Sequence, residues 1–247
     1  MVCSTRQFQK DLYWGYMSRQ VDGYVAFEYN LEVRPLTEYP KLLAKYLFDR
    51  FEMDDRTNLL EVGSGRGEGI IEFAKLGVIC TCVDSDQDVL DGIEQRCKEL
   101  GLKITTVRSD AENILPFPDT TFDVVYTKSL IEHISDPVSF FKEAKRLLTG
   151  KGKTINLILD WESQFKNFYD DVTHITPLTL VGAKQAVVFA GFKNVYSETF
   201  RQLPKCWKYP VLDKLADFIA PFVRYRTKHK TLRWIRELMI LVYGEKE

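Results

Sequence analysis

The sequence lacks any apolar run of the roughly 18 to 20 residues that a helix needs to span a bilayer. We also expect no apolar leader, because the opening residues are mostly polar. We therefore expect a cytoplasmic protein that can at most touch a membrane surface.

Cysteine and histidine are both scarce. The five cysteines are an odd number, and Cys80 and Cys82 are too close to form a CxxC pair for zinc. We interpret them as reduced, mostly buried thiols. The three histidines do not form a compact cluster with carboxylates in the sequence, so we expect no bound metal ion.

Neither sign of charge is in large excess, since the formal net charge is −1, but the charge is unevenly placed. Residues 201–247 hold 11 Lys and Arg against 5 Asp and Glu, whereas residues 1–200 hold 23 against 30. A broad apolar face in the basic segment can lie on an anionic membrane or, as we favour, pack on the rest of the fold. No nucleic-acid-reading module accompanies the charge, so we expect no nucleic-acid partner.

Hydrophobic residues between about 57 and 200 follow alternating strand and helix patterns. Strands that alternate with helices of roughly 10 to 12 residues predict a parallel sheet covered by helices on both faces. The expected strands are 59–62, 78–83, 103–107, 122–127 and 154–159, and the expected helices are 68–76, 89–100, 138–148 and 176–190.

The predicted fold is therefore α/β, with a Rossmann-like sheet and helical additions at both ends. We expect residues 1–50 to form an aromatic-rich helical lid, residues 51–200 the ligand-binding core, and residues 201–247 a basic helical extension. The aromatic residues of the lid either shield a bound ligand or cover outer helices, and both interpretations stay open. They include Tyr13, Trp14, Tyr16 and Tyr24.

A glycine-rich turn, GSGRG at residues 63–67, follows the first expected strand. A dinucleotide-binding turn needs a third glycine where this chain has Glu68 or, in the other register, Ile70. Glu61, two residues before the first glycine, instead suits a ligand with positive charge, such as S-adenosylmethionine with its sulfonium and ammonium groups. The turn thus disfavours a NAD-dependent oxidoreductase.

Two aspartates follow the next two expected strands. Asp84 follows the second strand, where a carboxylate can accept both ribose hydroxyls of an adenosine. Asp110 follows the third strand, where it can accept the adenine amino group. Each acid alone is a common loop or capping residue. Acids at three successive strand ends beside a glycine-rich turn favour one shared site.

Residues from about 55 to 200 resemble class I S-adenosylmethionine-dependent methyltransferases of the type 11 and 12 group. The resemblance is carried by LLEVGSGRGEG (59–69), CVDSD (82–86), SDAENILPFPDTTFDVVYTKSLIEHISDP (109–137) and EAKRLLTGKGKTINLI (143–158). It implies a seven-stranded sheet with one antiparallel edge strand, and it makes residues 51–200 the S-adenosylmethionine-binding core, with S-adenosylhomocysteine as product. The resemblance is specific for the cofactor and says little about the substrate.

The same resemblance assigns the cofactor contacts. It places Glu61 and the glycines near the methionine moiety, Asp84 on the ribose and Asp110 against the adenine, while Lys128 would face the transferred methyl group. The full expected set is Glu61, Gly63, Ser64, Gly65, Gly67, Asp84, Ser85, Asp110, Ala111 and Lys128.

Candidate catalytic residues lie after the fourth and fifth expected strands, and a base there would help a hydroxyl acceptor. His174 belongs to YDDVTHITP, which resembles a segment of methyltransferases linked to glycan biosynthesis. Asp170 or Asp171 can orient its imidazole as a base; alternatively, His174 caps the next helix or packs in the loop. His133 is a second candidate that can instead belong to a structural turn. The expected catalytic set is His174, Asp171 and His133.

The sequence thus predicts a methyltransferase that O-methylates a sugar, a glycan intermediate or another small hydroxylated metabolite. A lipid or quinone methyltransferase and an N-methyltransferase are alternatives among enzymes. A catalytically silent S-adenosylmethionine-binding partner protein is the alternative of a different class.

Overall fold

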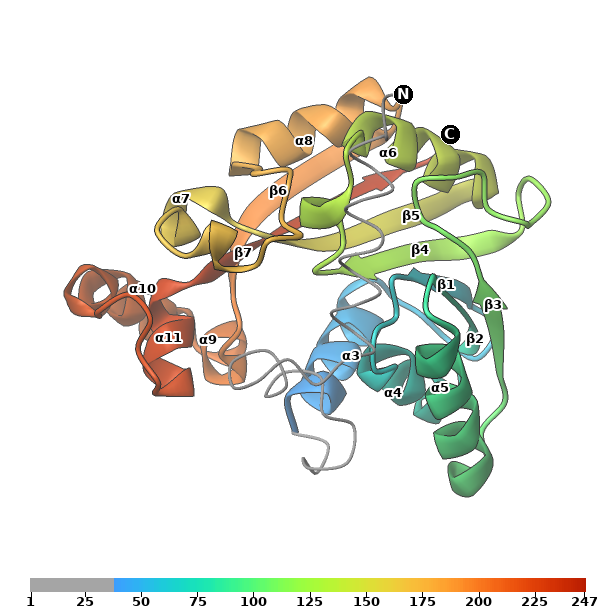
Figure 1. Ribbon diagram of the computed structural model, residues 1–247, viewed down its shortest axis with the longest axis horizontal. Coiled ribbons are helices and arrows are strands. Elements are labelled where there is room, and N and C mark those ends of the chain that lie inside the picture. The colour runs from blue at the N-terminus through green and yellow to red at the C-terminus, as the bar shows by residue number, and fades with distance from the viewer. Residues whose placement is uncertain (1–37) are drawn as a thin grey trace, which may run out of the picture. The chain divides into compact units, whose positions relative to one another are not determined.

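The computed structural model describes residues 38–247, which form a mixed seven-stranded sheet with helices (Figure 1). The strand order is β3-β2-β1-β4-β5-β7-β6. The strands are β1 (Asn58–Val62), β2 (Ile79–Asp84), β3 (Ile104–Arg108), β4 (Phe122–Lys128), β5 (Leu148–Leu159), β6 (Lys193–Arg201) and β7 (Leu238–Glu245). The α-helices are α3 (Glu38–Arg50), α4 (Glu68–Lys75), α5 (Gln87–Leu100), α6 (Pro137–Leu147), α7 (Trp161–Gln164), α8 (Leu180–Phe189), α9 (Pro204–Lys208), α10 (Pro210–Ile219) and α11 (Lys230–Arg236). The predicted α/β class is confirmed.

Local signals explain most of the element bounds. Helix α5 begins after Asp86, whose side chain accepts a hydrogen bond from the backbone N–H of Asp88, and ends before Gly101 in the left-handed conformation. Helix α6 begins in the same way, after Asp136 and with Pro137 in its first turn. These caps act within a few residues, and the expected helices 89–100 and 138–148 agree with α5 and α6 to within two residues at each end.

Helices cover both faces of the sheet (Figure 1). Helices α6 and α8 pack on one face, where Leu60 and Val62 of β1 join a buried cluster with Phe141 of α6. The residue between them, Glu61, points to the other face, because its carboxylate lies against Gly69 of α4. The two-residue period of the strand therefore places a single acid opposite the apolar core.

Strand β7 lies inside the sheet and runs antiparallel to both of its neighbours, β5 and β6. The antiparallel strand was expected at the edge, and this was wrong, because β6 is the edge strand. The expectation that residues 201–247 are helical throughout was also wrong for residues 238–245. The apolar residues of this segment are compatible with a helix that has two apolar stripes and also with a strand that is buried on both faces. Hydrophobic periodicity alone does not distinguish the helix from the strand.

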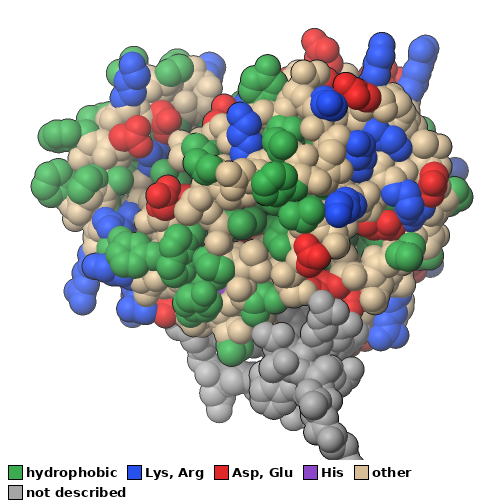
Figure 2. Space-filling view, turned by 90° about the horizontal axis from the view of Figure 1, so that it is seen from above, with side chains coloured by type: hydrophobic (Ala, Val, Ile, Leu, Met, Phe, Trp, Pro, Cys, Tyr) green, Lys and Arg blue, Asp and Glu red, His purple; other side chains and the backbone are tan. Residues whose placement is uncertain are grey.

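The segment between β6 and β7 contains the short helices α9, α10 and α11. Arg201, at the end of β6, is buried and donates hydrogen bonds to the carboxylates of Asp213 and Asp217 on α10. The residues of α10 that remain exposed are mostly apolar. Helix α10 lies at the left of Figure 1, and hydrophobic side chains gather at the left of the space-filling view in Figure 2. The exposed apolar residues of α10 include Val211, Leu215 and Phe218.

The last expected helix begins later than predicted. We expected a helix over 176–190, but α8 begins at Leu180. The backbone N–H groups of Ile175 and Thr176 donate to the carbonyl oxygen of Glu132 at 2.9 and 3.0 Å, which holds this segment against the chain after β4. A tertiary contact thus overrides the local start signal.

The aromatic residues expected to form a lid, such as Tyr13 and Trp14, lie outside the described residues. The four cysteines among the described residues are free and buried, as expected for reduced thiols. Within residues 38–247, no helix has both the length and the apolar character needed to cross a bilayer.

Candidate active site

The glycine-rich turn lies between β1 and α4, and its three glycines serve different purposes. Gly63, Gly65 and Gly67 all have positive φ, at 72°, 47° and 69°. A Cβ atom at Gly63 would meet the Leu130 side chain at 2.8 Å, and one at Gly67 would meet Ile93 at 2.5 Å. A Cβ at Gly65 would meet no atom within 4 Å. Two glycines therefore allow close packing, and the third faces open space where a ligand can approach the backbone.

Asp84, at the end of β2, holds this turn. One oxygen of its carboxylate accepts a hydrogen bond from the backbone N–H of Gly65 at 2.9 Å, and the other accepts from Asp86 at 3.1 Å. Burial raises the pKa of Asp84, although these backbone donors act in the opposite direction. Each carboxylate oxygen keeps a lone pair that can accept a ligand hydroxyl.

Ser64, Ser85, Asp110 and Ala111 lie at the same edge of the sheet as Asp84. β1, β2 and β3 are parallel neighbours, so their carboxyl ends meet there. The backbone N–H of Ser109 donates to the Asp84 carbonyl at 3.0 Å and joins the second and third strand ends. The structure thus brings the residues expected at three strand ends together.

Glu61 is a buried carboxylate beneath the start of α4. Its Oε1 atom lies 2.8 Å from the position that a Cβ at Gly69 would take, and its Oε2 atom has no hydrogen-bond partner. Burial raises the pKa of Glu61 to about 8, while Lys128 and the backbone N–H of Ile70 lower it. Such a carboxylate is stabilised as an anion by a bound cation.

Glu61 makes stability depend on pH. Its pKa rises from 4.5 in the unfolded chain to about 8 in the folded protein, so the folded state binds a proton more tightly. The stability contribution is therefore full below pH ~4.5 and is lost as the pH rises toward ~8. We expect the free energy of unfolding of the protein alone to fall over this range, and Glu61→Gln, which resembles the protonated form, to flatten the fall.

Urea denaturation at several pH values measures this effect. Glu99→Gln is the matched control, because Glu99 is exposed on α5. An equal pH dependence in Glu61→Gln and in the unaltered protein would show that Glu61 does not titrate as described.

The chain after β4 packs against the glycine turn and carries two further candidate residues. Leu130 lies against Gly63, and the following one-turn 3-10 helix contains Glu132 and His133. The loop after β5 is fixed to this helix, since the Thr176 hydroxyl donates to the Ile134 carbonyl at 2.6 Å. Residues far apart in the sequence therefore meet beside the turn.

His133 and His174 lie together, with ring centroids 4.8 Å apart. The Nδ1 atom of His174 is 2.6 Å from the carbonyl oxygen of Phe168, which can only accept a hydrogen bond. The Nδ1 atom of His133 is 3.2 Å from the carbonyl oxygen of Thr173 and 2.9 Å from its hydroxyl, which itself donates to Asp171. Both rings therefore carry hydrogen on Nδ1 when neutral, and Nε2 carries the lone pair.

Glu132 completes this group. Its side chain is 0% exposed, and neither carboxylate oxygen has a hydrogen-bond partner. Burial raises the pKa of Glu132 to about 7, while nearby backbone N–H groups, first that of Glu132 itself, and Lys128 lower it. Burial, followed by the neighbouring His174, lowers the pKa of His133 to about 4, so this imidazole is neutral at pH 7. One ligand atom from each of Glu132, His133 and His174 lies within 4.8 Å of the others.

The two aspartates that were expected to orient His174 behave differently. Asp170 accepts two hydrogen bonds from Arg226, at 2.6 and 2.7 Å, so its carboxylate is used elsewhere. The Oδ2 atom of Asp171 lies 3.8 Å from Nε2 of His174, and its other oxygen accepts from Thr173. The Phe168 carbonyl, not an aspartate, is hydrogen-bonded to Nδ1 of His174.

Sequence reasoning missed Glu132 and the cluster around it. The sequence showed no compact group of histidines and carboxylates, because His174 lies far along the chain from Glu132 and His133. The adjacent pair of Glu132 and His133 was the only local signal. Within the part of the chain that the structure describes, these residues form a group that could hold a metal ion.

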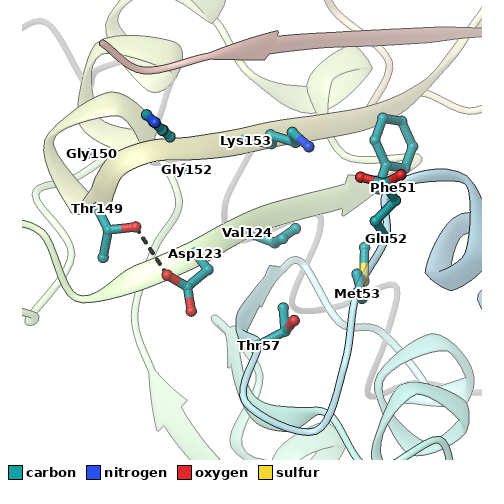
Figure 3. Close-up of a pocket in the computed structure, with 11 residues that line it drawn as sticks. Phe51, Glu52, Met53, Thr57, Asp123, Val124, Thr149, Gly150, Gly152 and Lys153 are labelled. Atoms are coloured by element: carbon teal, nitrogen blue, oxygen red, sulfur yellow. Dashed lines mark hydrogen bonds between the residues drawn. The ribbon is translucent and has the colours of Figure 1, made fainter.

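Figure 3 shows a depression at the end of the sheet opposite to the glycine turn. Thr57, just before β1, and Asp123, at the start of β4, line it. The Asp123 carboxylate accepts hydrogen bonds from the Thr149 hydroxyl and the Asn58 backbone, both at 3.0 Å. The Asp123 carboxylate is thus used to hold neighbouring strands together, and we assign no catalytic role to this depression.

Comparison with known proteins gives a consistent result. Residues 60–156 match the family model described as a methyltransferase domain. A ubiquinone biosynthesis O-methyltransferase of Vibrio campbellii is 27% identical over 49% of this chain and 52% of its own length. A sterol 4-C-methyltransferase of Caenorhabditis elegans is 26% identical over 66% and 52%. The chain thus spans about half the length of these curated relatives.

Solved structures share the fold. A SAM-dependent methyltransferase from Archaeoglobus fulgidus superposes with a TM-score of 0.63 at 19% identity, covering 91% of this chain and 100% of that one. A phosphoethanolamine N-methyltransferase of Haemonchus contortus, in complex with S-adenosyl-L-methionine, gives 0.62 at 18% identity, covering 83% and 52%. At these identities, the likeness concerns the fold.

Proposed function

We propose that this protein transfers a methyl group from S-adenosylmethionine to a hydroxyl group of a small molecule. Two findings support this: residues 60–156 match the family model of a methyltransferase domain, and the sheet shares the fold of solved methyltransferases. The observation that carries the proposal is the shared edge of the sheet. There the chain that packs on the glycine turn carries His133, whose ring lies 4.8 Å from that of His174.

The turn fits the cofactor. Open space at Gly65 allows a ligand to approach the backbone, and the buried Glu61 carboxylate suits the ammonium and sulfonium charges. Asp84 can accept the ribose hydroxyls, and Asp110 with Ala111 lies where the adenine would rest. When bound, S-adenosylmethionine supplies an electrophilic methyl group, and S-adenosylhomocysteine is the product.

The histidine pair favours a hydroxyl acceptor, because such an acceptor must lose its proton as the methyl group arrives. Neutral imidazoles with a lone pair on Nε2 suit that task. We assign removal of the proton to the group of His133, His174 and Glu132, with Asp171 as a positioning residue beside it. The chain's main further contribution is to hold the acceptor oxygen in line with the methyl group.

Two acceptor classes deserve testing. Sugars and glycan intermediates are supported by the resemblance of the His174 loop to glycan-associated methyltransferases. Lipids and quinones are supported by the relatives, whose names refer to ubiquinone and sterols, and by the exposed apolar residues of α10. A methyl-transfer screen over nucleotide sugars, prenylated phenols and sterols separates these classes. Cofactor binding without transfer to any of them would favour a catalytically silent binding protein.

Cofactor binding at the turn has a sharp test. We expect Gly65→Ala to weaken S-adenosylmethionine binding at least ~10-fold, because the new methyl group projects into the space the cofactor needs. Titration calorimetry with S-adenosylmethionine and S-adenosylhomocysteine measures this.

Gly101→Ala is the matched control for Gly65→Ala. Gly101 also has positive φ, at 67°, and a Cβ there also meets no atom within 4 Å, but it ends α5 away from the turn. Both variants should lose similar stability, roughly 1–2 kcal/mol, because alanine is strained in the left-handed conformation. Equal cofactor affinity in the two variants would contradict the placement of the cofactor.

A further inference from the structure

We propose that Glu132, His133 and His174 form a binding site for a divalent transition-metal cation such as Zn²⁺, with open coordination positions that face the acceptor. Two imidazole nitrogens and one carboxylate oxygen are ligands that zinc commonly takes in proteins. Three protein ligands, rather than four, are the composition of a catalytic zinc site.

The spacing of the three ligand atoms suits a cation. They lie within 4.8 Å of one another. Ligand atoms at bonds of about 2.0–2.2 Å from one ion lie roughly 3.3–4.4 Å apart. Small side-chain rotations would therefore close the group around an ion, without movement of the backbone.

The hydrogen bonds around the two histidines prepare them as ligands. A metal-bound histidine usually donates its other ring N–H to a carbonyl or carboxylate, which fixes the tautomer and the ring orientation. The Phe168 carbonyl accepts from Nδ1 of His174 at 2.6 Å, and Thr173 accepts from Nδ1 of His133. The Thr173 hydroxyl is itself held by Asp171. This arrangement directs the lone pair of each ring to Nε2.

Glu132 supplies the independent observation. A side chain that is 0% exposed and has no hydrogen-bond partner on either carboxylate oxygen is costly unless a cation neutralises it. The charge of Lys128 lowers the pKa of both Glu132 and Glu61, so the positive charge of one lysine is shared between two buried carboxylates. The cofactor brings positive charge to Glu61, and a metal cation would bring it to Glu132.

The role of the cation rests on the proposed function. With the ion bound, the lone pairs of His133 and His174 are used as ligands, so the three residues assist removal of the proton through the ion and not as free bases. The acceptor hydroxyl would coordinate to the cation, which lowers the pKa of that hydroxyl. The O–H bond breaks and the proton passes to solvent water. The oxygen lone pair then forms the new O–CH₃ bond as the S–CH₃ bond of the cofactor breaks, and the electron pair of that bond stays on sulfur.

The test begins with the full chain freed of metal and titrated with Zn²⁺, and with Co²⁺ as a spectroscopic probe. We expect one ion per chain and a Co²⁺ absorption spectrum that reports nitrogen and oxygen ligands. Glu132→Gln and His174→Ala should abolish stoichiometric binding. Thr173→Val, which removes a partner of His133, should weaken it roughly 10- to 100-fold. His229→Ala, at an exposed histidine on the C-terminal side, should bind as the unaltered protein does.

Each outcome has a defined meaning. Absence of binding in the unaltered protein, or equal binding in Glu132→Gln and His174→Ala, overturns the site. Cofactor binding by every variant, measured by calorimetry with S-adenosylmethionine, shows that the fold is intact. If the unaltered protein binds Zn²⁺ but no S-adenosylmethionine, the proposed function is overturned and the metal site is not. Turnover that is lost on chelation and restored by Zn²⁺ supports the role of the ion, and turnover unaffected by chelation overturns that role.

Discussion

Deleting residues 238–247 should leave no folded protein. These residues include β7, which pairs with β5 on one side and β6 on the other. The side chains of Met239–Val242 are fully buried, and burying four such residues is worth roughly 6–12 kcal/mol in total. Because whole domains are stable by only about 5–15 kcal/mol, the loss removes most or all of the stability. Circular dichroism and thermal denaturation of the truncated chain measure it.

A pair of leucine substitutions refines this prediction. Leu241→Ala removes a fully buried side chain of β7 and should cost about 2–5 kcal/mol. Leu232→Ala, on α11, removes a side chain that is 40% exposed and should cost much less. A folded truncated chain, or equal costs for the two leucines, would show that this segment is a dispensable extension.

Replacing His174 with alanine should lower methyl transfer about 100- to 10,000-fold, which is the usual contribution of a group that removes a proton. His174 is held by the Phe168 carbonyl and lies beside His133, next to the chain that packs on the glycine turn. The proposed cofactor contacts are made by other residues, so the affinity for S-adenosylmethionine should change little. Turnover with the acceptor found in the screen and calorimetry with the cofactor are the two measurements.

The exposed His229 gives the matched control for this substitution. His229→Ala removes the same side chain from the start of α11 and should keep full turnover. If His174→Ala also kept near-full turnover with normal cofactor binding, His174 would have no part in the reaction, and the loop after β5 would be only structural. If turnover and cofactor affinity both fell, His174 would be needed for the folded structure of the site and would not act in the reaction itself.

The turn at residues 63–67 could be predicted from the sequence because all of its parts are adjacent in the chain. Its glycines are needed by local backbone conformation and close packing, and Glu61 is two residues away. Asp84 and Asp110 could be placed beside it because consecutive strands of a parallel sheet end at one edge. The separate tasks of Gly63, Gly65 and Gly67 could not be predicted, since they depend on Leu130 and Ile93, which come from other parts of the chain.

Local chemistry therefore determined the order of most strands and helices, the caps of α5 and α6, and the edge of the sheet where we propose that the cofactor binds. The tertiary structure alone decided three other features. It made residues 238–245 a central strand, because only the neighbours β5 and β6 distinguish a doubly buried strand from a helix of the same apolar composition. It delayed the start of α8 through hydrogen bonds to the Glu132 carbonyl. It also joined His174 to Glu132 and His133, because hydrogen bonds across a long chain separation leave no periodic signal in the sequence.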